Sequence, residues 1–380
     1  MRVYLDHNAT TPLREEVVAA MAGALRDCFG NPSSTHAEGA AARAAIERAR
    51  AEVAALLGVA PAEVIFTAGA TEANNAALRG ALAARPERRH LVATCVEHPS
   101  VEEPLRALER GGLPVTRVRV DRDGRVDPDE FGAALRDDSA LAAVILANNE
   151  TGVLQDVAKL AERAHARGAW LHVDATQAVG KIPVDLVGLG ADSAAASAHK
   201  LNGPKGTGCL VVRKHVELAP FVLGGGQERR RRGGTENVAG IVGFGVACAL
   251  ARAELPERER RLAALRDRLW AGIERDIPRV RRNGDARHVL PNTLSVEFEG
   301  AAGEVLLEAL DGDGIAVSAG AACHSGSIEP SAVLLAMGRT PEEARGSLRL
   351  SVGPGTTDAE IERVLALLPA LVARVRAAGA

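Results

Sequence analysis

Two runs of sequence decide how this chain folds: Trp170-Leu-His-Val-Asp-Ala-Thr-Gln177 and Asp192-Ser-Ala-Ala-Ala-Ser-Ala-His-Lys200. Each begins with short, small or apolar residues, which is typical of a buried strand, and each ends in polar side chains. Five further runs of this kind occur at Val64–Thr67, Leu91–Thr94, Val115–Val120, Ala143–Ala147 and Gly208–Val212. Amphipathic helical patterns separate them, so the sequence predicts an α/β fold with a largely parallel sheet covered on both faces.

Asp174 and Lys200 stand at the ends of two of these predicted strands, where ligands gather in a parallel sheet. A lysine amine that stays partly neutral at a buried strand end can form a Schiff base with an aldehyde. An aspartate on a neighbouring strand end can hold a pyridinium nitrogen, and the two residues are the minimum protein apparatus for pyridoxal phosphate (PLP). Either residue alone has an ordinary structural explanation, but the pair predicts an enzyme that uses this cofactor.

Composition limits the class of protein. The chain has 380 residues and a net charge of -3, so it can bury a large core and is not typical of nucleic-acid or membrane-surface proteins. Its five cysteines are scattered without a Cys-x-x-Cys pair, so neither a disulfide framework nor a metal site is expected. The N-terminal residues lack the pattern of a signal peptide, and no uncharged apolar run reaches the roughly 20 residues that span a bilayer. We therefore expect a cytoplasmic protein without membrane segments.

The pattern changes after Gly240. A charged helical stretch at Ala249–Arg275 is expected to bridge two domains. Beyond it, strands are predicted at Thr293–Phe298, Ile315–Ser318 and Ser347–Val352, and helices at Gly303–Leu310, near Pro330–Met337 and from about Asp358. We predict a large domain over residues 15–250 and a smaller α/β domain formed by residues 1–14 and 251–380.

Several helix ends carry recognisable capping residues. Asp156 is expected to cap a helix at Val157–Arg167, which Gly168 closes, and Gly58 closes a helix at 41–57. Thr340 and Thr357 are each followed three residues later by a glutamate, which predicts two capping boxes.

Polar residues directly after the predicted strands are candidates for the site. Gly69-Ala70-Thr71-Glu72 opens a helix whose N–H groups and hydroxyl can bind a phosphate, with Ser197 as a second ligand. His98 could lie over a planar ring and move protons. Asn149 and Gln177 could bond a ring hydroxyl. Each of these residues also has an ordinary role in a capped helix, a surface loop or a turn, so none identifies the site alone.

Two loops and one strand residue complete the candidates. Gly224–Thr235 contains four consecutive arginines, but the chain has no P-loop motif and no early Gly-x-Gly-x-x-Gly, so a phosphate contact from Thr235 is preferred to nucleotide or RNA binding. Cys323 lies among small residues next to His324, which favours a reactive thiol on an adaptable loop. Arg349 interrupts an apolar strand pattern, where a guanidinium could grip a carboxylate.

In this order and spacing the motifs resemble those of the NifS/IscS-type cysteine desulfurases, which belong to the class V aminotransferase family and to the fold-type I PLP enzymes. The resemblance extends over nearly the whole chain. It rests on residues 4–12, 30–34, 66–72, 148–152, 174–177, 197–200 and 224–235, on the Cys323 loop through Ser331, and on Arg349. It implies a mainly parallel seven-stranded sheet flanked by helices, a smaller α/β C-terminal domain, PLP as the cofactor, and a homodimer with a shared active site.

The resemblance also implies a role for each candidate residue. Lys200 would bind the cofactor covalently and move the substrate Cα proton, and His98 would stack on the ring and assist. Asp174 would keep the ring nitrogen protonated, and Gln177 would bond the ring hydroxyl. The remaining cofactor contacts would come from Ala70, Thr71, Asn149, Ser197 and His199, and from Thr235 of the partner subunit. Asn149 and Arg349 would hold the substrate, L-cysteine, and Cys323 would take its sulfur as a persulfide while L-alanine is released.

Other interpretations stay open at this point. Ala322-Cys323-His324-Ser325 and the Gly-Gly-Gly-Gln-Glu-Arg loop are similar to those of selenocysteine lyases, so release of selenium from L-selenocysteine is the second interpretation. A class V aminotransferase is the third, and a non-catalytic scaffold is disfavoured because Lys200 and Cys323 are both present. The first expectation is a cysteine desulfurase that passes sulfur to an acceptor protein for iron–sulfur cluster assembly, tRNA thiolation or another sulfur transfer.

Overall fold

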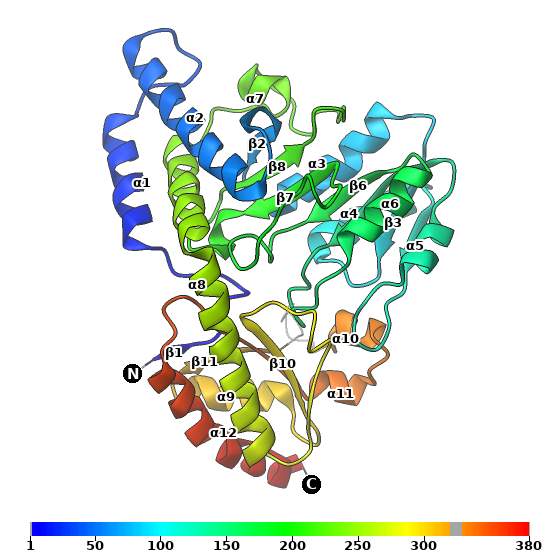
Figure 1. Cartoon of the computed structure of the whole chain (residues 1–380), viewed down its shortest axis with the longest axis vertical. Coiled ribbons are helices and arrows are strands. Elements are labelled where there is room, and N and C mark those ends of the chain that lie inside the picture. The colour runs from blue at the N-terminus through cyan, green and yellow to red at the C-terminus, as the bar shows by residue number, and fades with distance from the viewer. Residues whose placement is uncertain (1, 320–328, 380) are drawn as a thin grey trace.

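The computed structural model describes residues 2–319 and 329–379. Figure 1 shows two bodies: the elements from α1 (Glu15–Asp27) to α7 (Gln227–Arg230) form the upper one, and the C-terminal elements form the lower one. The long helix α8 (Val238–Asp276) passes from the upper body into the lower body. The short first strand, β1 (Val3–Tyr4), lies in the lower body, so both ends of the chain belong to that body.

A seven-stranded sheet forms the centre of the upper body. Its strands lie in the order β2 (Val64–Thr67), β8 (Gly208–Val212), β7 (Ser193–Ser197), β6 (Trp170–Asp174), β5 (Ser139–Ile145), β3 (His90–Thr94) and β4 (Val115–Val118). β8 is antiparallel to both of its neighbours, and the other pairs are parallel. The predicted fold class, with a mainly parallel sheet of seven strands, is confirmed.

Helices cover both faces of this sheet, because successive side chains of a strand point to opposite faces. One face carries α3 (Ala70–Ala84) and α4 (Pro99–Arg110), and the other carries α2 (Ala37–Leu57), α5 (Pro128–Ala134) and α6 (Val157–Ala166). On β3, Leu91 packs with the first pair, whereas its neighbour Val92 packs with the second group. Burial on both faces explains why these strands have continuous apolar sequences.

The lower body contains a smaller antiparallel sheet. Its strands lie in the order β12 (Ser318–Ala319), β13 (Ser347–Ser351), β10 (Thr293–Phe298) and β9 (Val280–Arg282). Helices α9 (Gly303–Gly312), α10 (Ala332–Ala336), α11 (Pro341–Arg345) and α12 (Asp358–Gly379) accompany this sheet. β1 pairs in parallel with β11 (Ile315–Ala316), which brings the first residues of the chain beside its C-terminal part.

Helix α8 belongs to both bodies. Its first half lies so close to α2 that a Cβ on Gly245 would come within 2.6 Å of the Ala49 Cα. Its second half contributes Leu265 and Leu269 to a separate apolar cluster in the lower body. By length and composition α8 could cross a membrane, but half of its most apolar window is buried inside the chain. Packing in the core therefore accounts for the buried half of this apolar window.

Most predicted elements are present, although the strand expected at Ala143–Ala147 is β5 at Ser139–Ile145 and the helix expected at 41–57 begins at Ala37, and three further differences occur. The charged stretch expected from Ala249 belongs to α8, which begins at Val238, because an apolar first half continues into a charged second half. The single strand expected at 315–318 is divided between two sheets, as β11 and β12. Asp156 does not cap α6 through its side chain, which instead pairs with the Lys159 amine at 2.7 Å. Both predicted capping boxes are confirmed, whereas the domain boundary at residue 250 stays a prediction.

A strained turn at α7 is attached to the sheet by a buried ion pair. Glu228, Arg229 and Arg230 have φ of 46°, 58° and 65°, a left-handed conformation that side chains disfavour. The Glu228 carboxylate accepts two hydrogen bonds from Arg50, at 2.7 and 2.9 Å, and one from the Phe66 main chain at 2.9 Å. The side chains of Arg50 and Glu228 are only 4% and 3% exposed. This pair therefore holds the start of the 224–235 loop against the sheet.

Replacing Glu228 by glutamine should lower the free energy of unfolding by about 3–5 kcal/mol, because Arg50 then stays buried without a full counter-charge. The matched control is Glu47→Gln, which removes a half-exposed partner of the same guanidinium at 3.1 Å and should cost under about 1 kcal/mol. Urea unfolding of both variants measures the difference. Equal losses would show that burial of the Arg50–Glu228 pair does not matter.

Candidate active site

A cavity of about 540 Å³ lies beside the carboxyl ends of β3, β5, β6 and β7, where the fold predicts a ligand site. Nine residues predicted from the sequence line it: Ala70, Thr71, His98, Asn149, Asp174, Gln177, Ser197, His199 and Lys200. Arg349 and Thr235 are not among the lining residues, and Cys323 lies outside the described residues. The fold thus brings most of the predicted residues together, although their individual roles stay predictions.

Lys200 ends a short 3-10 turn (Ala198–Lys200) that follows β7. Its amine donates to the main-chain carbonyls of Asn8 at 2.6 Å and of Ala9 at 2.8 Å. Burial, followed by the nearby Arg349 guanidinium, lowers the pKa of Lys200 from 10.5 to about 8, although Asp174 acts in the opposite direction. At neutral pH a useful fraction of the amine is therefore unprotonated, as a nucleophile requires.

Asp174 is the last residue of β6, and both of its carboxylate oxygens are anchored. The Thr176 main chain donates to one oxygen at 3.0 Å, and the amide of the fully buried Asn74 donates to the other at 2.8 Å. The Asn74 amide oxygen lies 2.8 Å from His172 Nε2. Burial lowers the pKa of His172 to about 4, so this ring is neutral and donates from Nε2. The plane of the Asp174 carboxylate is thereby held in place.

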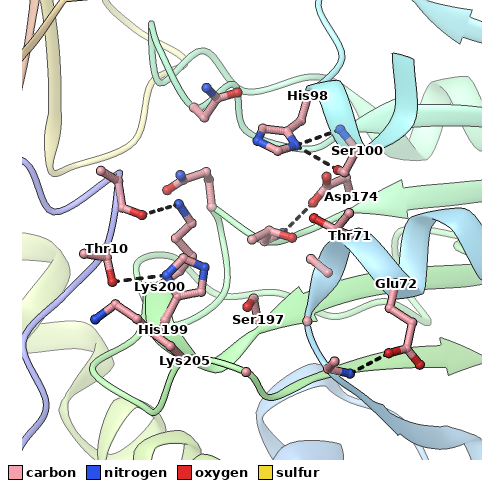
Figure 2. A pocket seen from close by; sticks show the side chains of 18 of the residues that line it. Thr10, Thr71, Glu72, His98, Ser100, Asp174, Ser197, His199, Lys200 and Lys205 are labelled. Carbon is pink, nitrogen blue, oxygen red and sulfur yellow. Dashed lines mark hydrogen bonds between the residues drawn. The ribbon is translucent and has the colours of Figure 1, made fainter. Parts of the chain in front are cut away.

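His98 caps helix α4 and presents one defined tautomer to the cavity. The main-chain N–H of Ser100 donates to His98 Nδ1 at 3.1 Å, and the Ser100 hydroxyl lies 2.8 Å from the same nitrogen (Figure 2). Because an N–H group can only donate, Nδ1 must carry a lone pair. Burial lowers the pKa of His98, against the nearby Asp174 charge and together with the smaller effect of Lys200, so the neutral ring carries its proton on Nε2.

The N-terminus of α3 forms part of the cavity wall and can bind an anion. Ala70 and Thr71 begin this 15-residue helix, where the first N–H groups have no partner within the helix. The wall also includes Ser197 and Lys205, which is a cation that sequence analysis did not predict. β8 lies so close to the residue before this helix that a Cβ on Gly208 would lie 2.7 Å from the Gly69 Cα. These groups together suit a phosphate.

His199 and Thr10 face each other beside Lys200. His199 Nδ1 lies 3.2 Å from the Thr10 hydroxyl (Figure 2). Burial, followed by the Lys200 charge, lowers the pKa of His199 to about 4. His199 is therefore a neutral hydrogen-bonding group at this position and adds no charge to an anion site.

Arg349 reaches the edge of the site from β13 in the lower body. Its guanidinium donates to the Asn149 carbonyl at 3.0 Å and to the Asp6 carboxylate at 2.6 Å. Its Nε is buried and has no hydrogen-bond partner among the described residues. The guanidinium therefore joins both bodies next to Asn149, which lines the cavity.

Thr235 is exposed and is the last residue of the 224–235 loop, whose start the Arg50–Glu228 pair holds. Arg232 in this loop pairs with Glu72 at the beginning of α3, at 2.9 and 3.2 Å. The loop therefore runs beside the cavity wall, while Thr235 does not contribute to the cavity of its own chain.

The donor set fits pyridoxal phosphate. The Thr176 hydroxyl belongs to a cavity-lining residue, is buried, and has no partner among the described residues, so it is available to a ligand. A helix N-terminus with Ser197 suits a phosphate, Asp174 suits a protonated ring nitrogen, and Lys200 suits an aldehyde.

Sequence reasoning missed several residues that build the site. Thr10, Ser100, Thr176 and Lys205 line the cavity but were assigned no role, although Thr176 lies within the motif that ends at Gln177. Asn74 and Asn8 support Asp174 and Lys200 from distant parts of the chain. Nothing in their local sequence indicates these contacts, because they depend on how the helices and the N-terminal segment pack.

Comparison with known proteins agrees with this geometry. Cysteine desulfurase from Cereibacter sphaeroides is 48% identical over 378 residues, which are 99% of this chain and 97% of that protein. A solved structure described as a NifS-like protein superposes with a TM-score of 0.92 at 37% identity and covers 98% of this chain and all of that one. A structure described as SspA in complex with cysteine has a TM-score of 0.83 at 33% identity and covers 94% of this chain and all of that chain.

The family comparison covers both bodies of the structure. Residues 3–364 match the model of the family described as aminotransferase class-V. Its members related to this chain are PLP enzymes, which agrees with the donor set of the cavity. From this match and from the relatives aligned along nearly its whole length, the chain belongs to the class V aminotransferase family.

Proposed function

We propose that this chain is a PLP-dependent cysteine desulfurase that converts L-cysteine to L-alanine and holds the sulfur as a persulfide on Cys323. The observation that carries this proposal is the convergence of Lys200, Asp174 and His98 on one cavity. Full-length similarity to cysteine desulfurases supports the substrate. The relatives do not favour the selenocysteine lyase interpretation, since those compared are named as desulfurases.

The residues of the cavity divide the chemical work among them. Bound PLP supplies an electron sink that stabilises negative charge at the substrate Cα. Lys200 anchors the cofactor, and its amine, once free, can take the Cα proton and return a proton to the product. The Asp174 carboxylate holds the ring nitrogen protonated. His98 lines the cavity, is oriented by Ser100 and would offer its Nε2 proton to groups bound there.

The substrate carboxylate would bind near Asn149 and Arg349. The guanidinium of Arg349 already donates hydrogen bonds to Asp6 and to the Asn149 carbonyl. Its buried Nε–H has no partner among the described residues. A planar guanidinium is suited to a carboxylate because it can donate two parallel hydrogen bonds.

Sulfur transfer is assigned to Cys323. Its thiolate would attack the substrate sulfur and form an S–S bond while the substrate C–S bond breaks. The electron pair of the broken bond stays with the carbon, which is then protonated to give L-alanine. The sulfur leaves as a Cys323 persulfide, from which the thiol of an acceptor protein takes it in a second exchange.

We extend this proposal to the assembly and its surroundings. Thr235 is exposed and does not line the cavity of its own chain, which supports a homodimer in which it contributes to the partner's site. The scattered cysteines support a reducing, cytoplasmic setting. The acceptor would be a protein of iron–sulfur cluster assembly, of tRNA thiolation or of another sulfur transfer.

Labelling of the Lys200 amine in cofactor-free protein by an amine-reactive reagent should increase with pH through a midpoint near 8, because only the neutral amine reacts. Arg349→Gln should move this midpoint upward, since the guanidinium is the second cause of the lowered pKa. Mass spectrometry of the peptides measures the labelling, with the exposed Lys159 as an internal control. A Lys200 midpoint near 10.5 would contradict the described environment.

Lys200→Ala should reduce alanine release from L-cysteine to background while leaving the fold intact, because both the cofactor anchor and the proton carrier are lost. Thermal unfolding of the cofactor-free protein, which should stay close to wild type, is the control for folding. Appreciable remaining turnover would refute the proposed mechanism.

The decisive experiment is alanine release from L-cysteine and from L-selenocysteine by wild type and by Cys323→Ala. We expect the variant to lose the cysteine reaction and to keep its yellow cofactor, because Cys323 receives sulfur without binding PLP. A variant that still turns over cysteine would exclude the persulfide step. A wild type that strongly prefers selenocysteine would show that the chain is a lyase.

A further inference from the structure

Lys181 is a buried cation that the proposed chemistry does not use. It follows Gln177 by four residues in the turn after β6, and it is only 5% exposed. The charged groups that act on it within the described chain are Lys200 and Arg349, which are both cations. A buried charge without a counter-charge is costly, so its presence requires a physical reason.

The contacts of Lys181 are two neutral oxygens. Its amine donates to Gln177 Oε1 at 2.6 Å and to Asn8 Oδ1 at 3.0 Å. Burial, followed by Lys200 and Arg349, lowers the pKa of Lys181 well below 10.5. An amine donates to these two oxygens in either protonation state, so both contacts persist when the charge is lost.

The contact with Lys181 determines which way the Gln177 amide points. Gln177 Nε2 donates to the Asn8 carbonyl at 2.8 Å, and a main-chain carbonyl can only accept. The Lys181 amine donates to the amide oxygen, so the nitrogen of the Gln177 amide has an acceptor and its oxygen has a donor. One hydrogen of Nε2 remains, and Gln177 lines the cavity.

Asn8 connects the same lysine to the rest of the site. Its side-chain oxygen accepts from Lys181 and, at 3.0 Å, from Asn292 of the lower body. Its main-chain carbonyl accepts from both Gln177 and Lys200. Lys181 therefore supports the segment against which the Lys200 amine rests.

We propose that Lys181 is a positioning residue that, by holding the Gln177 amide oxygen and the Asn8 side chain, directs a Gln177 N–H at the ring oxygen of bound PLP. This inference rests on PLP occupying the cavity, as proposed above, but it does not depend on sulfur transfer. Lys181 acts through Gln177 and touches neither the substrate nor the cofactor.

The test is a double-mutant cycle of Lys181→Met and Gln177→Leu in the full chain, read by PLP affinity and by the pH titration of the bound cofactor's visible absorption. Lys181→Met should weaken PLP binding about tenfold, the equivalent of one hydrogen bond. It should also move the titration midpoint to higher pH, because a ring oxygen that loses a donor becomes more basic. In the Gln177→Leu background the same change should alter the PLP affinity less than about twofold and should leave the titration midpoint nearly unchanged.

An unchanged affinity and midpoint in Lys181→Met would overturn the proposal. A full tenfold loss that persists in the Gln177→Leu background would do so as well, because Lys181 would then act independently of Gln177. Both readouts omit a sulfur substrate, so a failure of the desulfurase proposal would leave them interpretable.

Gln177→Glu keeps Lys181 and covers the case in which Lys181→Met does not fold. The carboxylate gives Lys181 a counter-charge but turns an acceptor oxygen toward the Asn8 carbonyl, so the unfolding temperature of the cofactor-free variant serves only to check that it folds. It has no N–H to give to the ring oxygen, so PLP should bind at least about tenfold more weakly. A folded variant with unchanged PLP affinity would contradict the proposal.

Discussion

The partial burial of the Lys200 amine is the constraint on which the site depends. The amine rests on the carbonyls of Asn8 and Ala9, and burial lowers its pKa to about 8. This requires that the N-terminal segment cross the ends of the sheet strands, and the segment is in turn held by the lower body through Asn292 and Thr293. The reactivity of one lysine therefore depends on contacts between both parts of the molecule.

A second set of residues orients the groups that would touch the cofactor. Asn74 orients Asp174, Ser100 selects the tautomer of His98, and Lys181 supports Gln177. All three supporting residues are buried or nearly so, where an unmatched polar group is costly. Because each hydrogen bond has a defined donor and acceptor, the site is largely organised before any ligand binds, which is how proteins lower the cost of binding.

Much of the fold and nine of the residues that line the cavity could be predicted from the sequence. Strands β2, β8 and β10 have the bounds expected from their apolar runs, because burial on both faces leaves a continuous pattern. The polar residues after the strands were predicted to converge, because the ends of parallel strands meet at one edge of a sheet. The division between β11 and β12 was not predicted, since a short apolar run does not reveal which sheet it joins.

The sequence by itself determined the α/β class, the family resemblance and the pairing of Lys200 with Asp174, because these depend on residue order and local pattern. Only the tertiary structure decided the support of the site. Asn8 and Lys181 are 173 positions apart, and no local pattern indicates that their side chains meet. The proton position on His98 and the lowered pKa of Lys200 are likewise tertiary properties, because they arise from burial and from charges that distant segments bring together.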